Sequence, residues 1–347
     1  MFPPIRNAAF TRDYFLMVKR YYALGQFAKK IWDDSVIVSI ELYKIIIPVT
    51  IIVKVLQEVG AIKYIAAALS PVMQVVGLPG SMGFVWATTM LTNLYAGMVA
   101  FTMLAPGLHL TAAQVTVLTS MMLIAHSLPV EVGITKKSGV RIRVIGTVRL
   151  LCAFLYGWLL NNVYLLLNWN QHPNTVAWVP KVKSSSLLSW GLGEIKKLII
   201  IFFIIVGLHL LLEIFNKTGI TDVIIRALRP VLHFLKISEK AMTMVLVGMV
   251  MGLAYGGGLI IKEAKLGNID RKDIFSALVL LSLCHSLIED TLLMVVLGGQ
   301  VSGVLWGRML FAFVLVYFIV KIVDRIPDSF FEKFLFKTVS PAHANID

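Results

Sequence analysis

Long, unbroken runs of apolar residues dominate this chain, and short polar stretches separate them. About 20 apolar residues in a helix cross the hydrocarbon core of a bilayer. The runs are continuous rather than alternating, which favours helices over a membrane β-barrel. The pattern therefore predicts an all-α integral membrane protein with about 8–10 transmembrane helices. The ten predicted segments are residues 38–58, 61–77, 80–103, 111–128 and 142–168, then 194–215, 220–236, 240–261, 269–287 and 303–325.

The second five segments repeat the first five. Residues 126–154 align without a gap on residues 285–313, a shift of 159 positions. Upstream, a one-residue gap is needed to place Tyr95 on Tyr255. Duplicated halves in a membrane protein usually enclose a binding site near the bilayer midplane. We therefore divide the chain into an amphipathic cytoplasmic segment (1–35), a first repeat (36–168), a linker (169–193), a second repeat (194–325) and a cytoplasmic tail (326–347).

The distribution of charge predicts that the two repeats are inverted. Residues 105–110 carry no Lys or Arg, whereas the equivalent residues 262–273 carry four; residues 132–143 carry four, whereas residues 291–302 carry none. Lys and Arg accumulate in cytoplasmic loops, so equivalent loops of opposite bias should lie on opposite sides of the membrane. Proline in the second segment of each half indicates broken or re-entrant helices, which would change the number of crossings.

Composition agrees with a membrane location. Hydrophobic residues make up 58% of the chain and charged residues 15%, and the net charge is +13. The basic residues sit mainly at the ends of apolar runs, which indicates contact with lipid headgroups rather than with nucleic acid. We expect a multi-pass protein of the bacterial inner membrane, with both termini cytoplasmic and the lipid bilayer as its main partner. The sequence leaves the choice between monomer and homodimer open.

The strongest candidates for chemistry are two matching polar clusters that follow the fourth segment of each repeat. They contain His126, Ser127 and Glu131 in the first repeat, and His285, Ser286, Glu289 and Asp290 in the second. Ionisable groups at bilayer depth are costly, so they are functional candidates by default. Imidazole beside carboxylate could bind a divalent metal, relay protons or hydrogen-bond a polar solute, and the sequence does not choose a metal. The alternative is structural, with each histidine capping a helix end and pairing with its neighbouring carboxylate.

Two further pairs of residues have equivalent positions in the repeats. Arg149 and Arg308 each begin an apolar helix, where they either form an internal salt bridge, reach a headgroup or contact the substrate. The third pair consists of small-residue segments, in which Asn93, Tyr95 and Tyr255 offer polar groups midway along a span. Close helix packing explains the glycines of these segments equally well.

These motifs resemble the Gate, or nucleoside-recognition, family. The resemblance rests on the segments Leu94-Tyr95-Ala96-Gly97-Met98 and Ala254-Tyr255-Gly256-Gly257-Gly258, the His-Ser-Leu-x-x-Glu/Asp motif and the helix led by arginine, and it covers about residues 40–165 and 195–325. Related modules occur in ferrous-iron permeases, spore maturation proteins A and B and, more distantly, concentrative nucleoside transporters. The resemblance implies a permease with two modules, and the family's name implies a nucleoside-like solute.

We therefore expect a secondary transporter of a small polar solute or ion, with its site between the two repeats. The chain has no Walker-type phosphate loop, His-Glu-x-x-His pair, Cys-x-x-Cys site or Gly-x-Ser-x-Gly elbow, so we expect neither an enzyme nor a bound cofactor. Two alternatives stay open. The chain could be an enzyme acting on a lipid-linked substrate, with the His/acid clusters as general base and acid, or an accessory subunit of another membrane complex.

Overall fold

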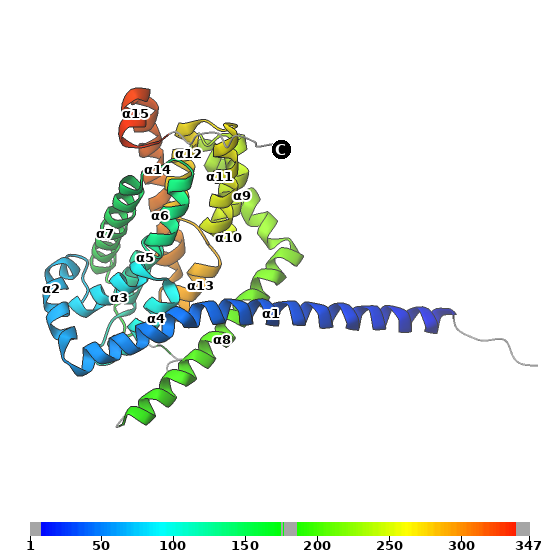
Figure 1. The fold of residues 1–347 in the computed structure, drawn as a ribbon, viewed down its shortest axis with the longest axis horizontal. Coiled ribbons are helices and arrows are strands. Elements are labelled where there is room, and N and C mark those ends of the chain that lie inside the picture. The colour runs from blue at the N-terminus through cyan, green and yellow to red at the C-terminus, as the bar shows by residue number, and fades with distance from the viewer. Residues whose placement is uncertain (1–7, 175, 177–185, 338–347) are drawn as a thin grey trace, which may run out of the picture. The chain divides into compact units, whose positions relative to one another are not determined.

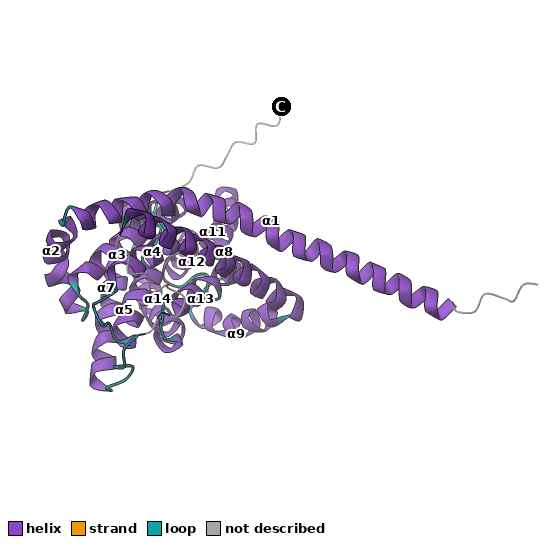
Figure 2. Cartoon of the chain, turned by 90° about the horizontal axis from the view of Figure 1, so that it is seen from below, coloured by secondary structure: helices purple, strands orange, loops and turns teal. Residues whose placement is uncertain are grey.

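The protein is helical throughout its described part. The computed structural model describes residues 8–174, 176 and 186–337, and their side chains except those of residues 8–24, 254 and 255. Helices joined by short loops make up this part of the chain (Figure 2). In these residues β-structure is limited to two isolated bridges. The Tyr255 side chain, predicted to belong to the site, lies outside the described residues.

The chain divides into two compact units. The first contains residues 1–44 and 180–214, and the second contains residues 45–179 and 215–347. Helix α1 (Ala8–Glu58) and helix α8 (Leu187–Thr218) each contribute to both units. Within the first unit, Trp32 packs edge-on against Phe202 at 5.1 Å between ring centroids, and the Tyr43 hydroxyl donates to the Leu198 carbonyl at 2.6 Å.

The boundaries of these helices differ from the predicted segments. Helix α1 runs without interruption through the expected boundary at residue 35. Helix α8 begins at Leu187, inside the stretch predicted as a linker, and residues 175 and 177–185 of that stretch lie outside the described residues. In the predicted tail, residues 328–334 form a short helix, α15, and residues 338–347 lie outside the described residues.

The second unit contains the remaining helices, which Figure 1 labels. In chain order these are α2 (Ala61–Val75), α3 (Gly80–Leu91), α4 (Leu94–Leu104), α5 (Ala112–Ile124), α6 (Leu128–Lys137), α7 (Ile142–Leu166), α9 (Ile220–Phe234), α10 (Glu239–Met251), α11 (Leu253–Leu266), α12 (Arg271–Leu283), α13 (Glu289–Val296), the π-helix η1 (Ser302–Gly307), α14 (Arg308–Arg325) and α15 (Asp328–Phe334).

The helices of this unit recur at the shift seen in the sequence. Helices α2 and α9 begin at Ala61 and Ile220, and helices α5 and α12 begin at Ala112 and Arg271, so both pairs are 159 positions apart. Even the turns correspond. Two pairs of positive-φ glycines lie at equivalent positions with nearly equal φ: Gly60 and Gly219 (71° and 76°), then Gly139 and Gly298 (103° and 102°).

The gap placed between Tyr95 and Tyr255 is wrong. Helices α4 and α11 begin at Leu94 and Leu253, which are again 159 positions apart, so the structural register needs no gap. Tyr95 is therefore equivalent to position 254. The sequence alignment failed here because tyrosine and glycine happen to match better one residue further along.

Close approach between the halves of the broken third segment explains its glycines. A Cβ on Gly97 would collide with the Thr89 side chain, and a Cβ on Gly256 would collide with the Gly248 backbone. Both contacts join residues at equivalent positions of the two repeats. Small residues here let α3 approach α4, and α10 approach α11, at backbone distance.

Breaks in the chain reduce the number of uninterrupted spans. In the described residues, five helices are long and apolar enough to cross a membrane, or up to six if α2 and α3, bent by 91°, form one span. The predicted segments 80–103 and 240–261 are each divided, at Asn93 and Gly252, into two half-helices. The Asn93 side chain accepts from the Ala96 amide at 2.9 Å and so begins α4, whereas Gly252 adopts a φ of 97°. The expected fold class, an all-α integral membrane protein with broken helices, is confirmed.

The contact between α10 and α11 yields a stability prediction. We expect Gly256→Ala to lower the free energy of unfolding by about 1–3 kcal/mol, because the added methyl group meets backbone that cannot move aside. Gly258→Ala is the matched control, since a Cβ there meets no atom within 4 Å. Thermal unfolding of both purified variants in detergent measures the difference, and equal midpoints would contradict this packing.

Candidate functional site

Two sharp turns at equivalent positions create the site. After α5 ends at Ile124, Ser127 adopts a left-handed φ of 46°, and α6 then begins at Leu128. After α12 ends at Leu283, Ser286 adopts a φ of 47° before α13 begins. A non-glycine residue in this region costs roughly 1–2 kcal/mol, so both turns hold an unfavourable backbone conformation. The turns place His126 and His285, which precede the two serines, at the breaks between half-helices.

Backbone bonds from the neighbouring broken helix hold each turn. The Ser127 amide donates to the Thr89 carbonyl of α3 at 3.1 Å, and the Ser286 amide donates to the Gly248 carbonyl of α10 at 3.4 Å. Thr89 and Gly248 are again equivalent positions. The site is therefore built twice, from the same two breaks in each repeat.

Each imidazole is oriented by its own helix. His126 Nδ1 lies 3.1 Å from the carbonyls of Met122 and Leu123, and His285 Nδ1 lies 2.6 Å from the Leu281 carbonyl. A carbonyl oxygen can only accept, so Nδ1 carries the hydrogen in both rings. In the neutral state each Nε2 then presents a lone pair.

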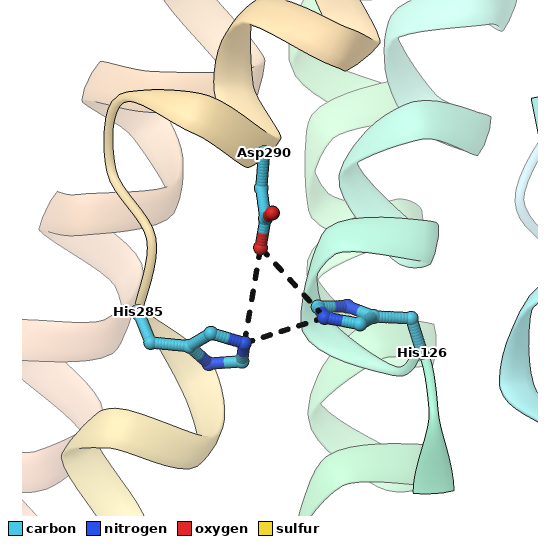
Figure 3. Close-up of side chains that lie close together, drawn as sticks. All are labelled: His126, His285 and Asp290. Atoms are coloured by element: carbon cyan, nitrogen blue, oxygen red, sulfur yellow. Dashed lines mark hydrogen bonds and ion pairs between the residues drawn. The ribbon is translucent and has the colours of Figure 1, made fainter. Parts of the chain in front are cut away.

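The two histidines and two carboxylates converge on one point. The Nε2 atoms of His126 and His285 are 3.3 Å apart. Asp290 Oδ2 lies 3.7 Å from the first and 3.8 Å from the second. Glu131 Oε1 lies 3.0 Å from His126 Nε2 and 3.4 Å from His285 Nε2. Figure 3 shows both imidazoles and the Asp290 carboxylate turned toward one another, one histidine from each repeat.

This cluster is buried. His126 is 5% exposed, His285 3% and Glu131 8%, and the Asp290 side chain is 14% exposed. Buried charge is stable only when it is paired, neutralised or bound to a metal. What the cluster can bind therefore depends on which of its carboxylates are already paired with a positive charge.

Arg149 compensates one of the two carboxylates. This arginine is fully buried, its Nη1 forms an ion pair with Glu131 Oε2, and its Nε donates to the Ile124 carbonyl at 2.9 Å. This contact is the internal salt bridge predicted from the sequence as one of the possible roles of Arg149.

Arg308, the equivalent residue, has different partners. It is also fully buried, and its Nη2 lies 3.3 Å from Thr291 Oγ1 and 3.5 Å from the His285 carbonyl. In the described part of the chain no lysine or arginine pairs with Asp290, and Nε and Nη1 of Arg308 have no hydrogen-bond partner. The sequence did not single out Thr291, because its equivalent in the first repeat is Val132.

The other predicted site residues have supporting contacts. The Ser286 hydroxyl accepts from the Asp290 backbone amide at 3.3 Å, and the Tyr95 and Glu289 side chains lie near each other. Asn93 caps α4, and Ser127 contributes its amide to the turn. Whether these residues bind a ligand stays a prediction.

Contacts between the repeats fix the second cluster against the first. The backbone amide of Gln300 donates to Thr116 Oγ1 at 2.9 Å, and the Tyr156 hydroxyl donates to the Gly303 carbonyl at 2.7 Å. The Tyr164 and Ser302 hydroxyls lie 3.0 Å apart. The sequence did not predict these contacts, because a single polar residue within an apolar run does not indicate which segment it contacts.

Comparison with known proteins agrees with the membrane fold. Residues 39–138 match the model of the Gate family, described as nucleoside recognition. The chain is 28% identical over 278 residues to the uncharacterized membrane protein YvoD of Bacillus subtilis (strain 168), an alignment that covers 77% of this chain and 85% of YvoD. No solved structure matches the chain. The match confirms the resemblance to the Gate, or nucleoside-recognition, family for residues 39–138 of this multi-pass membrane protein, which lie in the first of the two predicted modules.

Proposed function

We propose that this protein is a secondary transporter whose binding site comprises His126, Glu131, His285 and Asp290. The observation that carries the proposal is the buried contact between equivalent breaks of the two repeats, with His126 Nε2 3.3 Å from His285 Nε2. Broken helices at corresponding positions of two repeats are typical of transporter sites, because unwound backbone and polar side chains can replace the water around a solute. The site takes a small polar solute or ion and is exposed alternately to the two sides of the membrane.

The path of the chain supports inverted repeats. His126 contacts His285, whereas Thr116, ten residues before His126, contacts Gln300, fifteen residues after His285. Residues 116–126 of the first repeat and residues 285–300 of the second therefore run in opposite directions past each other. If both lie roughly along the membrane normal, the axis that relates them lies in the membrane plane, as in many secondary transporters. The opposite charge of equivalent loops supports the same arrangement.

The cluster itself favours binding over a purely structural role. A buried ion pair contributes little net stability, and apolar residues of similar volume often replace one without loss. Four ionisable side chains that converge from two repeats are a costly way to join helices. The Gate family's description adds nucleosides to the solutes that the site is tested against.

Uptake into proteoliposomes tests the proposal. Purified protein is reconstituted, and uptake of uridine, adenosine, amino acids and divalent cations is measured. We expect saturable uptake of one class by the native protein, at least a tenfold loss in Asp290→Asn and in His285→Ala, and no loss in His172→Gln, which removes an exposed loop histidine. Equal uptake by native protein and Asp290→Asn, at equal amounts of folded protein, would contradict the proposed site.

A second prediction distinguishes the carboxylate that is paired with a buried arginine from the one that is not. Glu131→Gln leaves the buried Arg149 guanidinium without its counter-charge, which we expect to cost about 3–5 kcal/mol of folding free energy. The double variant Glu131→Leu/Arg149→Leu should recover most of this loss. Asp290→Asn should cost much less, since no lysine or arginine among the described residues pairs with Asp290. Thermal unfolding of the purified variants measures these losses of folding free energy. A larger loss in Asp290→Asn than in Glu131→Gln would contradict the prediction.

A third prediction tests inversion. His109 and Asn268 are exposed residues at equivalent positions of the two repeats. We expect a membrane-impermeant maleimide, added to intact cells, to label His109→Cys but not Asn268→Cys, and to label both after permeabilisation. The native protein is the control, because Cys152 and Cys284 are both buried. Labelling of both variants from the same side would show that the repeats are parallel.

A further inference from the structure

We infer that His126, His285 and Asp290 bind a divalent transition-metal ion of the zinc class. The inference deepens the site proposed above by naming its ligand, and it rests on the proposed function for the consequence that the ion is moved. Binding itself is a separate property of the cluster and can be measured without transport.

The positions of the three donor atoms fit a metal ion. His126 Nε2, His285 Nε2 and Asp290 Oδ2 form a triangle with sides of 3.3, 3.7 and 3.8 Å. The point equidistant from the three atoms in their plane lies about 2.1 Å from each of them. This matches the Zn–N and Zn–O distances of protein sites, roughly 2.0–2.2 Å. Among the residues that the structure describes, these three form the group of His, Cys, Asp and Glu side chains whose ligand atoms lie close enough together to hold a metal ion.

The hydrogen bonds of both rings are those of metal ligands. A histidine that ligates through one ring nitrogen almost always donates its other N–H to a carbonyl or carboxylate, which fixes the tautomer and raises the basicity of the ligating nitrogen. Nδ1 of His126 and Nδ1 of His285 both donate to carbonyls of the preceding helical turn. Both Nε2 atoms are therefore directed to the same small volume, where two unprotonated nitrogens repel each other unless a proton or a metal ion lies between them.

The charges around the cluster favour a cation at this position. Glu131 is already paired with Arg149, whereas Asp290 contacts only the two imidazoles among the ionic partners described. Arg308 does not neutralise Asp290, since its Nη2 bonds to Thr291 and the His285 carbonyl. Asp290 therefore supplies a carboxylate that no lysine or arginine among the described residues pairs with, beside two imidazole nitrogens.

The spacing also selects the kind of ion. Six-coordinate geometry at this bond length separates neighbouring donors by roughly 2.9 Å, and four-coordinate geometry by roughly 3.3–3.4 Å. The observed sides of 3.3–3.8 Å exceed the six-coordinate value at this bond length, which favours zinc-like ions over Mg²⁺. The two imidazole donors disfavour Ca²⁺, which prefers oxygen ligands. Glu131 Oε1 lies 3.0 Å from His126 Nε2 and 3.4 Å from His285 Nε2, so a fourth, oxygen ligand lies beside the three donors. Four donors of this kind suit the tetrahedral geometry of zinc.

The test is metal binding by the full-length purified protein in detergent. Co²⁺ serves as the probe because four-coordinate Co²⁺ absorbs visible light far more strongly than six-coordinate Co²⁺. We expect one Co²⁺ per chain with the strong four-coordinate absorption, and displacement of it by Zn²⁺ but not by Mg²⁺. We expect His126→Gln, His285→Gln and Asp290→Asn each to weaken Zn²⁺ binding by at least roughly tenfold, since loss of even a supporting contact typically costs 10–100-fold. His172→Gln, the matched histidine control, should bind as the native protein does.

X-ray absorption of the Zn²⁺ complex of the native protein makes the result independent of whether the variants fold. Two imidazole ligands and an N/O shell near 2.0–2.1 Å are expected. No stoichiometric binding, or a shell without two imidazoles, would overturn the inference, and titration of the histidine pair by protons alone would then describe the site. Stoichiometric Zn²⁺ binding without uptake would overturn only the proposed transport. Uptake of an organic solute by metal-free protein that binds no Zn²⁺ would overturn only this inference.

Discussion

The contact between two imidazoles from opposite repeats is the interaction on which the rest of the site depends. Both rings donate Nδ1–H to carbonyls of their own helix, so both Nε2 lone pairs meet at 3.3 Å within a buried cluster. Such an arrangement is stable only if a proton or a metal ion lies there or if nearby charges compensate it. The carbonyls of Met122 and Leu281 orient these rings, and the carboxylates of Glu131 and Asp290 lie beside them.

Backbone geometry makes this contact possible. A continuous helix through residue 126 or 285 would satisfy its carbonyls internally and hold the side chain on its own face. The left-handed serines stop each helix instead, and the neighbouring broken helices bind the freed amides at Thr89 and Gly248. Contacts within each repeat thus stabilise the unfavourable backbone conformation of its turn. Contacts between the repeats then bring the two breaks together.

Much of this arrangement can be predicted from the sequence, and there are physical reasons why the rest cannot. Continuous apolar runs gave the all-α membrane fold, and the repeated His-Ser-Leu motif identified both histidines and both acids. The sequence left open whether α3–α4 and α10–α11 are broken, because small residues at these points are as typical of close helix packing as of local unwinding. Nor did it reveal that Arg149 pairs with an acid while Arg308 does not. That difference depends on Thr291, where the repeats differ in sequence.

In the inferred metal site one cation lies between the two repeats, held by His126, His285 and Asp290. Anomalous diffraction at the zinc edge from Zn²⁺-treated crystals of the full-length protein would locate that cation. We expect a single strong peak about 2.1 Å from both Nε2 atoms and from Asp290 Oδ2. A structure in which the two histidines are separated, or in which zinc binds elsewhere and leaves this cluster empty, would contradict it.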